Sequence, residues 1–91
     1  TDRDVSAIVG EGVAWASIVS CVEGLRLPNL ESVAHVVTYR GKQTGAGKKS
    51  VSARLVFRAP DRTLTGDEVD ASVAKAISAL QASLGAEIRS A

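Results

Sequence analysis

The sequence is poor in the residue types that build several common kinds of site. Its one cysteine, Cys21, excludes an internal disulfide, and with the one histidine, His35, it leaves too few ligands for a structural zinc site. No run approaches the roughly 18–20 apolar residues that span a bilayer, and no basic-then-apolar signal segment follows Thr1. We therefore expect a cytoplasmic protein with no membrane partner. Its 91 residues leave room for one domain with a modest core, which excludes paired nucleotide- and substrate-binding domains.

The charge is small in sum but uneven along the chain. The net charge of +1 argues by itself against a nucleic-acid partner. Residues 40–62, which we call the basic segment, hold seven basic residues and one acid and so carry +6, whereas the four basic and nine acidic residues elsewhere give −5. Such a block is a candidate electrostatic footprint for a polyanion. An exposed hairpin kept soluble by lysine and arginine explains it equally well.

Hydrophobic patterning predicts four strands and two helices. Short β-branched or alternating runs predict strands over residues 5–9, 33–39, 50–58 and 86–90. Apolar residues at three- and four-residue spacing predict helices over 14–25 and over 65–84, the second opened by the capping box Thr65-Gly66-Asp67-Glu68 and ended by Gly85. A glycine-rich loop at 41–48 and a turn at 60–62 provide connections. The order βαββαβ predicts an α+β, ferredoxin-like sandwich, in which two helices cover one face of a four-stranded antiparallel sheet.

Alternation along the strands separates a core face from an open face. The predicted core joins inward strand residues to one apolar stripe from each helix: Val5, Ala7, Val9, Val51, Ala53, Leu55, Phe57 and Ile88, with Trp15, Ile18, Val22 and Leu25, and with Val69, Val73, Ala76, Ile77, Leu80 and Leu84. The other face has a small, polar centre with one aromatic residue and several arginines: Ser6, Val37, Tyr39, Ser50, Ser52, Arg54, Arg58 and Arg89. RNA-binding domains of this topology hold their ligand on such a face.

No group of residues predicts a catalytic or metal site. An acylphosphatase of this length would need glycines and an arginine after the first strand to cradle phosphate, and Glu11 stands there instead. The glycine-rich loop opens a strand rather than a helix, and its spacing is one residue too long for a P-loop. Cys21 has no nearby histidine, and His35 has no partner at a ligand spacing. An RNA-recognition motif would expose aromatics on its third strand, whereas here Phe57 faces inward and Tyr39 is the one platform.

Five runs of residues, in a fixed order, resemble one known family. They are Tyr39-Arg40-Gly41-Lys42-Gln43, Gly47-Lys48-Lys49-Ser50, Phe57-Arg58-Ala59-Pro60-Asp61-Arg62-Thr63-Leu64-Thr65, Glu68-Val69 and Leu84-Gly85-Ala86-Glu87-Ile88-Arg89. Together with Arg3-Asp4-Val5, they resemble the ferredoxin-fold anticodon-binding domain at the C-terminus of the bacterial phenylalanyl-tRNA synthetase β chain. The resemblance covers essentially the whole chain. We therefore expect residues 1–91 to be one such domain, excised from a longer protein.

The resemblance implies a role in tRNA binding and none in catalysis for this chain alone. In the family this domain recognises the anticodon stem-loop of phenylalanine tRNA, while catalysis lies elsewhere in an (αβ)2 enzyme that uses ATP and Mg²⁺. We thus expect no cofactor in this chain, and as partners the tRNA, the rest of the β chain and the α chain. Tyr39 corresponds to the tyrosine that stacks on the first anticodon base, Ser50 to a serine that hydrogen-bonds that nucleotide, and Arg89 to the arginine of the final strand. Val37 replaces a common aspartate, whose carboxylate could accept hydrogen bonds from a guanine edge.

The sequence thus predicts an RNA-binding interface on the open face and the basic segment, without catalytic or metal-binding residues. Its members are Val37, Tyr39, Arg40, Lys48, Lys49, Ser50, Ser52, Arg54, Arg58 and Arg89. A second hypothesis stays open, in which a structural or ligand-sensing ferredoxin-like module holds protein partners through its sheet. That hypothesis predicts basic residues gathered away from the open face.

Overall fold

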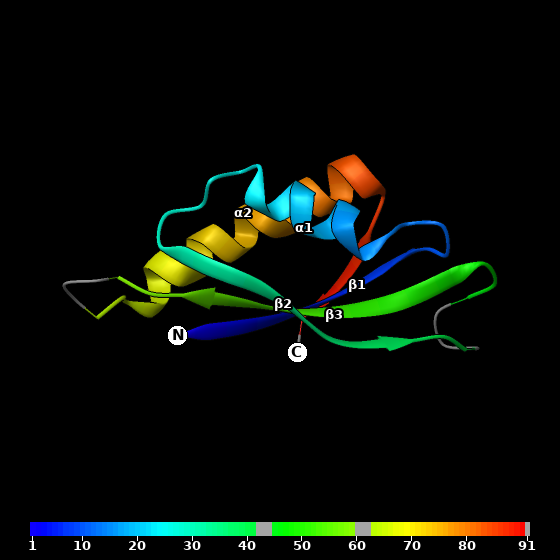
Figure 1. Ribbon diagram of the computed structural model, residues 1–91, viewed down its shortest axis with the longest axis horizontal. Helices are drawn as coiled ribbons and strands as arrows, with labels where there is room; N and C mark the ends of the chain where they lie inside the picture. Colours follow the sequence, from blue (N-terminus) through cyan, green and yellow to red (C-terminus); the bar gives the residue numbers. More distant parts are fainter. Residues whose placement is uncertain (42–44, 60–62, 91) are drawn as a thin grey trace.

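Two helices lie on one side of a four-stranded sheet (Figure 1). The structure is a computed structural model that describes residues 1–41, 45–59 and 63–90. In chain order its elements are β1 (Asp2–Gly10), α1 (Trp15–Glu23), β2 (Leu30–Tyr39), β3 (Lys48–Phe57), α2 (Gly66–Leu84) and β4 (Glu87–Ser90). The sheet order is β2-β3-β1-β4, with every neighbouring pair antiparallel. The predicted α+β, ferredoxin-like arrangement is therefore confirmed.

The first three strands begin earlier than the hydrophobic pattern indicates, whereas β4 begins one residue later, at Glu87. β1 starts at Asp2 instead of Val5, because Asp2 pairs with Val56 and the ladder runs from there to Gly10 opposite Lys48. Polar residues such as Asp2 join a strand when a neighbouring strand supplies hydrogen bonds, whatever their own preference for the strand state. β2 likewise starts at Leu30, which pairs with Phe57. Its register shifts twice, between Leu30 and Ser32 and between His35 and Val37.

The core lies between the sheet and the helices, as the alternation predicts. Its largest fully buried side chains are Phe57, Ile18, Leu55, Val9, Val22 and Val69. Leu25 is an exception to the predicted helical stripe. α1 ends at Glu23 with Gly24 as its C-cap, so Leu25 lies beyond the helix and is 39% exposed. Ser72 is buried in the stripe of α2, where the apolar pattern does not mark it.

The capping signals of α2 are confirmed in atomic detail. The Thr65 hydroxyl accepts the backbone N–H of Glu68 at 3.2 Å, and the Glu68 carboxylate accepts the backbone N–H of Thr65 at 3.0 Å. Gly85 ends the helix in the left-handed region at φ 63°, a conformation that favours glycine. Both ends of the long second helix are thus capped.

Parts of the predicted connections fall outside the described residues. The turn predicted at 60–62 lies there, as do residues 42–44 of the glycine-rich loop. Within the described ranges, neither helix combines the length and the apolar character that crossing a bilayer needs.

Candidate nucleic-acid interface

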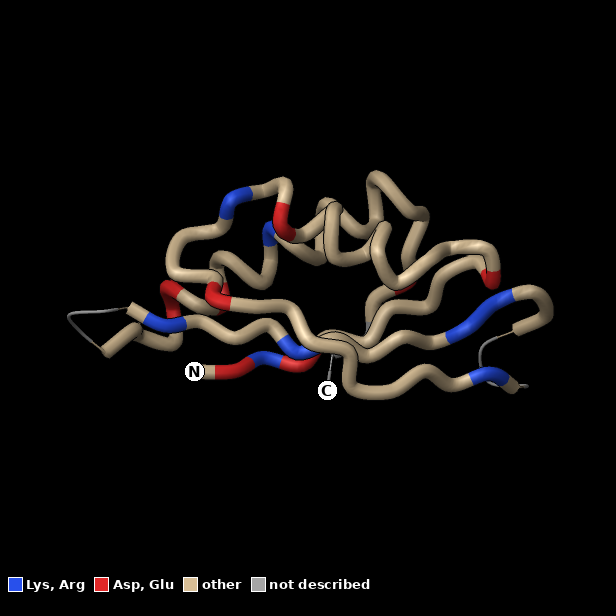
Figure 2. Tube along the Cα trace, in the orientation of Figure 1, with Lys and Arg blue, Asp and Glu red and all other residues tan. Residues whose placement is uncertain are grey.

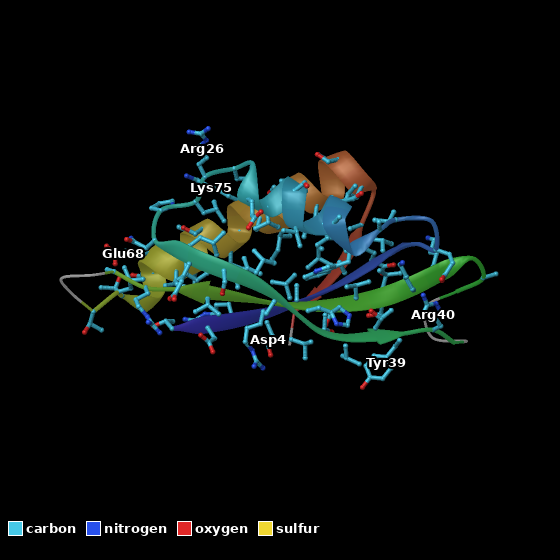
Figure 3. All side chains as sticks on the ribbon, in the orientation of Figure 1. Asp4, Arg26, Tyr39, Arg40, Glu68 and Lys75 are labelled. Carbon is cyan, nitrogen blue, oxygen red and sulfur yellow. The ribbon has the colours of Figure 1, made fainter. Side chains whose placement is uncertain are left out.

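The face of the sheet turned away from the helices carries three adjacent cross-strand rows of side chains. We define them by the register of β2, β3, β1 and β4. The tyrosine row is Tyr39, Ser50, Ile8 and Glu87; the serine row is Val37, Ser52, Ser6 and Arg89; the arginine row is Ala34, Arg54 and Asp4. Figure 3 shows the side chains of Tyr39 and Asp4 on the side of the sheet opposite the helices. These rows contain every residue predicted for the open face except Arg58, which lies beyond the end of β3 at Phe57.

The tyrosine row offers a platform for an aromatic base. Tyr39 is 63% exposed, the most exposed of the large hydrophobic side chains among the described residues. It ends β2 and pairs with Ser50, which is half-buried. Next in the row, Ile8 is only 5% exposed although it lies on the open side, between β3 and β4. A flat, exposed ring beside a hydroxyl can stack on a base and hydrogen-bond it at once.

The serine row has a hydroxyl pair at the centre of the sheet. The Oγ atoms of Ser6 and Ser52 lie 2.9 Å apart, and either can donate to the other. Val37 stands at one end of the row and is half-buried. At the other end the backbone of Arg89 pairs with Ser6, which places Arg89 on the open side of β4 by register. The side chain of Arg89 lies outside the described part of the structure.

The arginine row is an ion pair. The Arg54 guanidinium donates Nε–H to one oxygen of the Asp4 carboxylate at 2.8 Å and Nη2–H to the other at 3.1 Å. These hydrogen bonds, and then the opposite charge, lower the pKa of the Asp4 carboxyl and raise the pKa of Arg54. Arg54 is therefore on the open face, as predicted, but a carboxylate already occupies its donor fork.

Every described arginine of the basic segment is paired with an acid from outside that segment. Besides Arg54, Arg40 donates Nε–H to the Glu11 carboxylate at 2.7 Å, and Arg58 lies 3.1 Å from the Glu31 carboxylate. Figure 2 shows that basic and acidic positions are interspersed along the strands and the turns that join them. The three acids cut the +6 of the segment to +3. The charge of the basic segment counted from the sequence is therefore larger than its net charge in the folded chain, where these acids lie against it.

The remaining predicted cations are spread over the molecule rather than gathered at Tyr39. Lys48 shares the open-side register of Ser50 at the start of β3. Lys49 pairs with the buried Val9, so its register points toward the helices rather than the open face. Arg58 follows the far end of β3, eight residues beyond Ser50, which is roughly 27 Å along a strand. The register brings together six of the predicted residues: Val37, Tyr39, Ser50, Ser52, Arg54 and, by the position of its backbone, Arg89.

Sequence reasoning missed the acids of this surface. Strand alternation does place Asp4 on the open side, but only the pairing of β1 with β3 puts it opposite Arg54. Glu11 contacts the basic segment twice, because its backbone N–H also donates to the Gly47 carbonyl at 2.8 Å. These contacts join positions 29 to 50 residues apart along the chain, so no local signal marks them.

The contacts of His35 and Cys21, the other residues considered for a chemical role, indicate structural roles. His35 sits edge-on to Trp15, with ring centroids 5.3 Å apart, and its Nε2 lies 2.7 Å from the Thr38 hydroxyl. Cys21 is partly buried against the core. No three His, Cys, Asp or Glu side chains converge on a possible metal position in residues 1–41, 45–59 and 63–90. In the part of the chain that is described, the open face is the arrangement best suited to a ligand.

Comparison with known proteins agrees with this geometry. Residues 1–89 match the description "Ferredoxin-fold anticodon binding domain". The chain belongs to this family. Its relatives include three proteins named phenylalanine–tRNA ligase beta subunit, from Geobacter sulfurreducens, Nocardia farcinica and Clostridium tetani. They are 39%, 41% and 39% identical over 98%, 96% and 97% of this chain.

The domain spans only about a tenth of the length of these relatives, 11%, 10% and 11% respectively. The resemblance seen in the sequence runs is thereby confirmed at the level of the family. The tyrosine and serine rows occupy the open face of this anticodon-binding fold.

Proposed function

We propose that this domain is the tRNA-binding module of a phenylalanine–tRNA ligase β subunit and contacts the anticodon stem-loop of phenylalanine tRNA through its open face. The observation that carries the proposal is Tyr39, an exposed ring beside the Ser50 hydroxyl in a chain that matches an anticodon-binding family. A base stacked on Tyr39 lies within reach of Ser50. The loop of a tRNA hairpin is single-stranded, and unpaired bases are what aromatic platforms bind.

Charge supports the proposal in a limited way. Lys48 stands at the tyrosine end of β3, and Arg40 follows Tyr39 directly. A phosphate that reaches Arg40 or Arg54 must compete with Glu11 or Asp4. Affinity is therefore expected to depend on stacking first and on phosphate contacts second, and to fall with salt by a slope of about −0.7 per phosphate contacted.

The parent assembly belongs to the same proposal. The relatives are named as ligase β subunits, of which this chain covers about a tenth, so we propose that it acts as a non-catalytic domain of a longer β chain, together with an α chain in an (αβ)2 enzyme. ATP and Mg²⁺ would act elsewhere in that enzyme. The turn after β1 carries Glu11, whose charge does not suit a nucleotide phosphate. The proposed location stays cytoplasmic.

The test is a titration of the 91-residue chain with an RNA hairpin that has the sequence of the phenylalanine tRNA anticodon stem-loop, at low salt. Tyr39→Ala should weaken binding by about 1–3 kcal/mol, or roughly 5- to 150-fold, because the stacking platform is lost. Tyr39→Phe keeps the ring and should bind nearly as the wild type does. Leu25→Ala removes another exposed hydrophobic side chain, far from the sheet face, and serves as the matched control.

Two results would contradict the proposal. If the wild-type chain binds the hairpin no better than an unrelated hairpin of equal length, the anticodon role is wrong. Equal affinities of the wild type and Tyr39→Ala would show that RNA binds somewhere other than the tyrosine row. The first result favours the alternative of a module that holds protein partners, whereas the second moves the RNA site away from the tyrosine row.

A further inference from the structure

The hydroxyl pair of the serine row lies on the open face, where a ligand can reach it, which a purely structural pair does not need. Ser6 and Ser52 come from β1 and β3, the two inner strands of the sheet, and meet at 2.9 Å in the middle of the open face. Both side chains are half-buried, so they are held in place yet reachable from outside. Val37 on one side leaves no charge there to compete for the hydroxyls.

After their mutual hydrogen bond, the two serine hydroxyls can still donate and accept further hydrogen bonds. Two hydroxyls bring two donor hydrogens and four lone pairs, and their mutual bond uses one of each. One donor and three lone pairs remain, directed from two oxygens a hydrogen-bond length apart. A ligand hydroxyl matches this set, because it can donate to one serine oxygen and accept from the other.

The position of the pair relative to Tyr39 suits a neighbouring nucleotide. The serine row follows the tyrosine row by two residues along β3, from Ser50 to Ser52, which is about 6.8 Å. One nucleotide of an extended single strand covers a similar distance. A strand whose base stacks on Tyr39 and whose next residue runs along β3 therefore brings the next sugar over Ser6 and Ser52.

We propose that the Ser6–Ser52 pair binds the ribose 2′-hydroxyl of the nucleotide adjacent to the one stacked on Tyr39, and thereby selects RNA over DNA. The inference rests on the proposed function, because it needs a strand on the tyrosine row. The 2′-hydroxyl is both donor and acceptor and is the group that distinguishes the two nucleic acids. Base identity is a poorer match: the mutual hydrogen bond can run in either direction, so the pair accepts base donors and acceptors alike.

The experiment compares two hairpins on the 91-residue chain by fluorescence anisotropy. One is the all-ribose anticodon stem-loop, and the other has 2′-deoxyribose at every loop position. The wild type should prefer the ribose hairpin by roughly fivefold, the worth of one hydrogen bond. Ser6→Ala/Ser52→Ala should bind both hairpins with nearly equal affinity, and each single variant, which keeps one hydroxyl, should give an intermediate ratio.

The matched control is Ser32→Ala. Ser32 lies opposite Val56, beyond the arginine row on the same face, and is exposed. Its loss should leave the ribose preference unchanged. Thermal unfolding of all variants establishes that they fold, and a purely structural pair would alter only that measurement.

The outcomes separate the inference from the proposed function. If the wild type binds both hairpins equally, or if the double variant keeps the full ribose preference, the serine pair does not read the sugar, although the domain still binds RNA. A single 2′-deoxy substitution at each loop position in turn should locate the effect at one nucleotide. If neither hairpin binds, the proposed function is wrong and the inference falls with it.

Discussion

Asp4→Asn should strengthen RNA binding, although it removes a native ion pair. In the folded chain both oxygens of the Asp4 carboxylate accept hydrogen bonds from Arg54, at 2.8 and 3.1 Å, in the arginine row of the open face. A phosphate that approaches Arg54 therefore meets a competing anion. Asparagine keeps nearly the same shape and removes the charge, so the guanidinium becomes available to RNA.

The size of the gain follows from counterion release. One additional phosphate contact steepens the dependence of log K on log salt by about 0.7 for a single strand. If that contact contributes nothing at 1 M salt, the gain in affinity is about eightfold at 0.05 M and about threefold at 0.2 M. Anisotropy titrations with the anticodon hairpin over this salt range measure both the gain and the slope.

Two controls separate this local effect from a general change in charge. Asp67→Asn makes the same chemical change in the first turn of α2, away from the open face, and should leave the affinity almost unchanged. Asp4→Asn combined with Arg54→Met should lose the gain, because the freed guanidinium is absent. If Asp4→Asn binds RNA with the wild-type affinity and slope, the ion pair does not mask Arg54 and the reasoning is refuted. The same conclusion follows if Asp67→Asn gains as much.

Two further changes test the base-reading position and the second helix. Val37→Asp places a carboxylate one row from Tyr39 on the same face. It should raise the affinity roughly tenfold for a hairpin with guanine as first anticodon base, because the carboxylate accepts charged hydrogen bonds from the guanine N–H groups. A hairpin with adenine at that position should gain no affinity, and equal gains for both hairpins would contradict base reading. Thr65→Ala removes the hydroxyl that accepts the Glu68 N–H, and should lower the free energy of unfolding by about 1 kcal/mol in urea titrations. Thr63→Ala, two residues earlier and also exposed, is its control. A similar loss of stability in both variants would argue against the cap.

The fold was predictable because its signals are local. The alternation from Ser50 to Phe57 separates the two faces of β3, and the capping box at Thr65 marks where α2 begins. The sequence also marks Tyr39 as the lone aromatic outside the core. The end of α1 was harder to predict. Leu25 continues the apolar spacing of the helix, yet Gly24 ends it one residue earlier.

The electrostatics of the open face were not predictable, because they depend on register between distant strands. Asp4 lies 50 residues from Arg54, and Ser6 lies 46 residues from Ser52. A shift of one residue in the pairing of β1 with β3 would turn the side chains of Asp4 and Ser6 toward the core face. Lys49 is the opposite case, because local alternation is enough to predict which face it lies on. Its odd position in β3 already groups it with Val51 on the helix side, so alternation alone argues against its inclusion in an open-face interface.

The ion pairs change how this surface is expected to work. A face of free arginines would hold any polyanion, with an affinity set by salt. Here the described arginines of the basic segment already have carboxylate partners, so a phosphate gains only the difference between two ion pairs. Under the proposals made above, stacking on Tyr39 and hydrogen bonding by the serine hydroxyls face no such competition, and they would respond to an unpaired base and a ribose rather than to charge. The proposed function therefore predicts selectivity for a single-stranded RNA loop over other polyanions, and the acids that weaken the charge would be part of its cause.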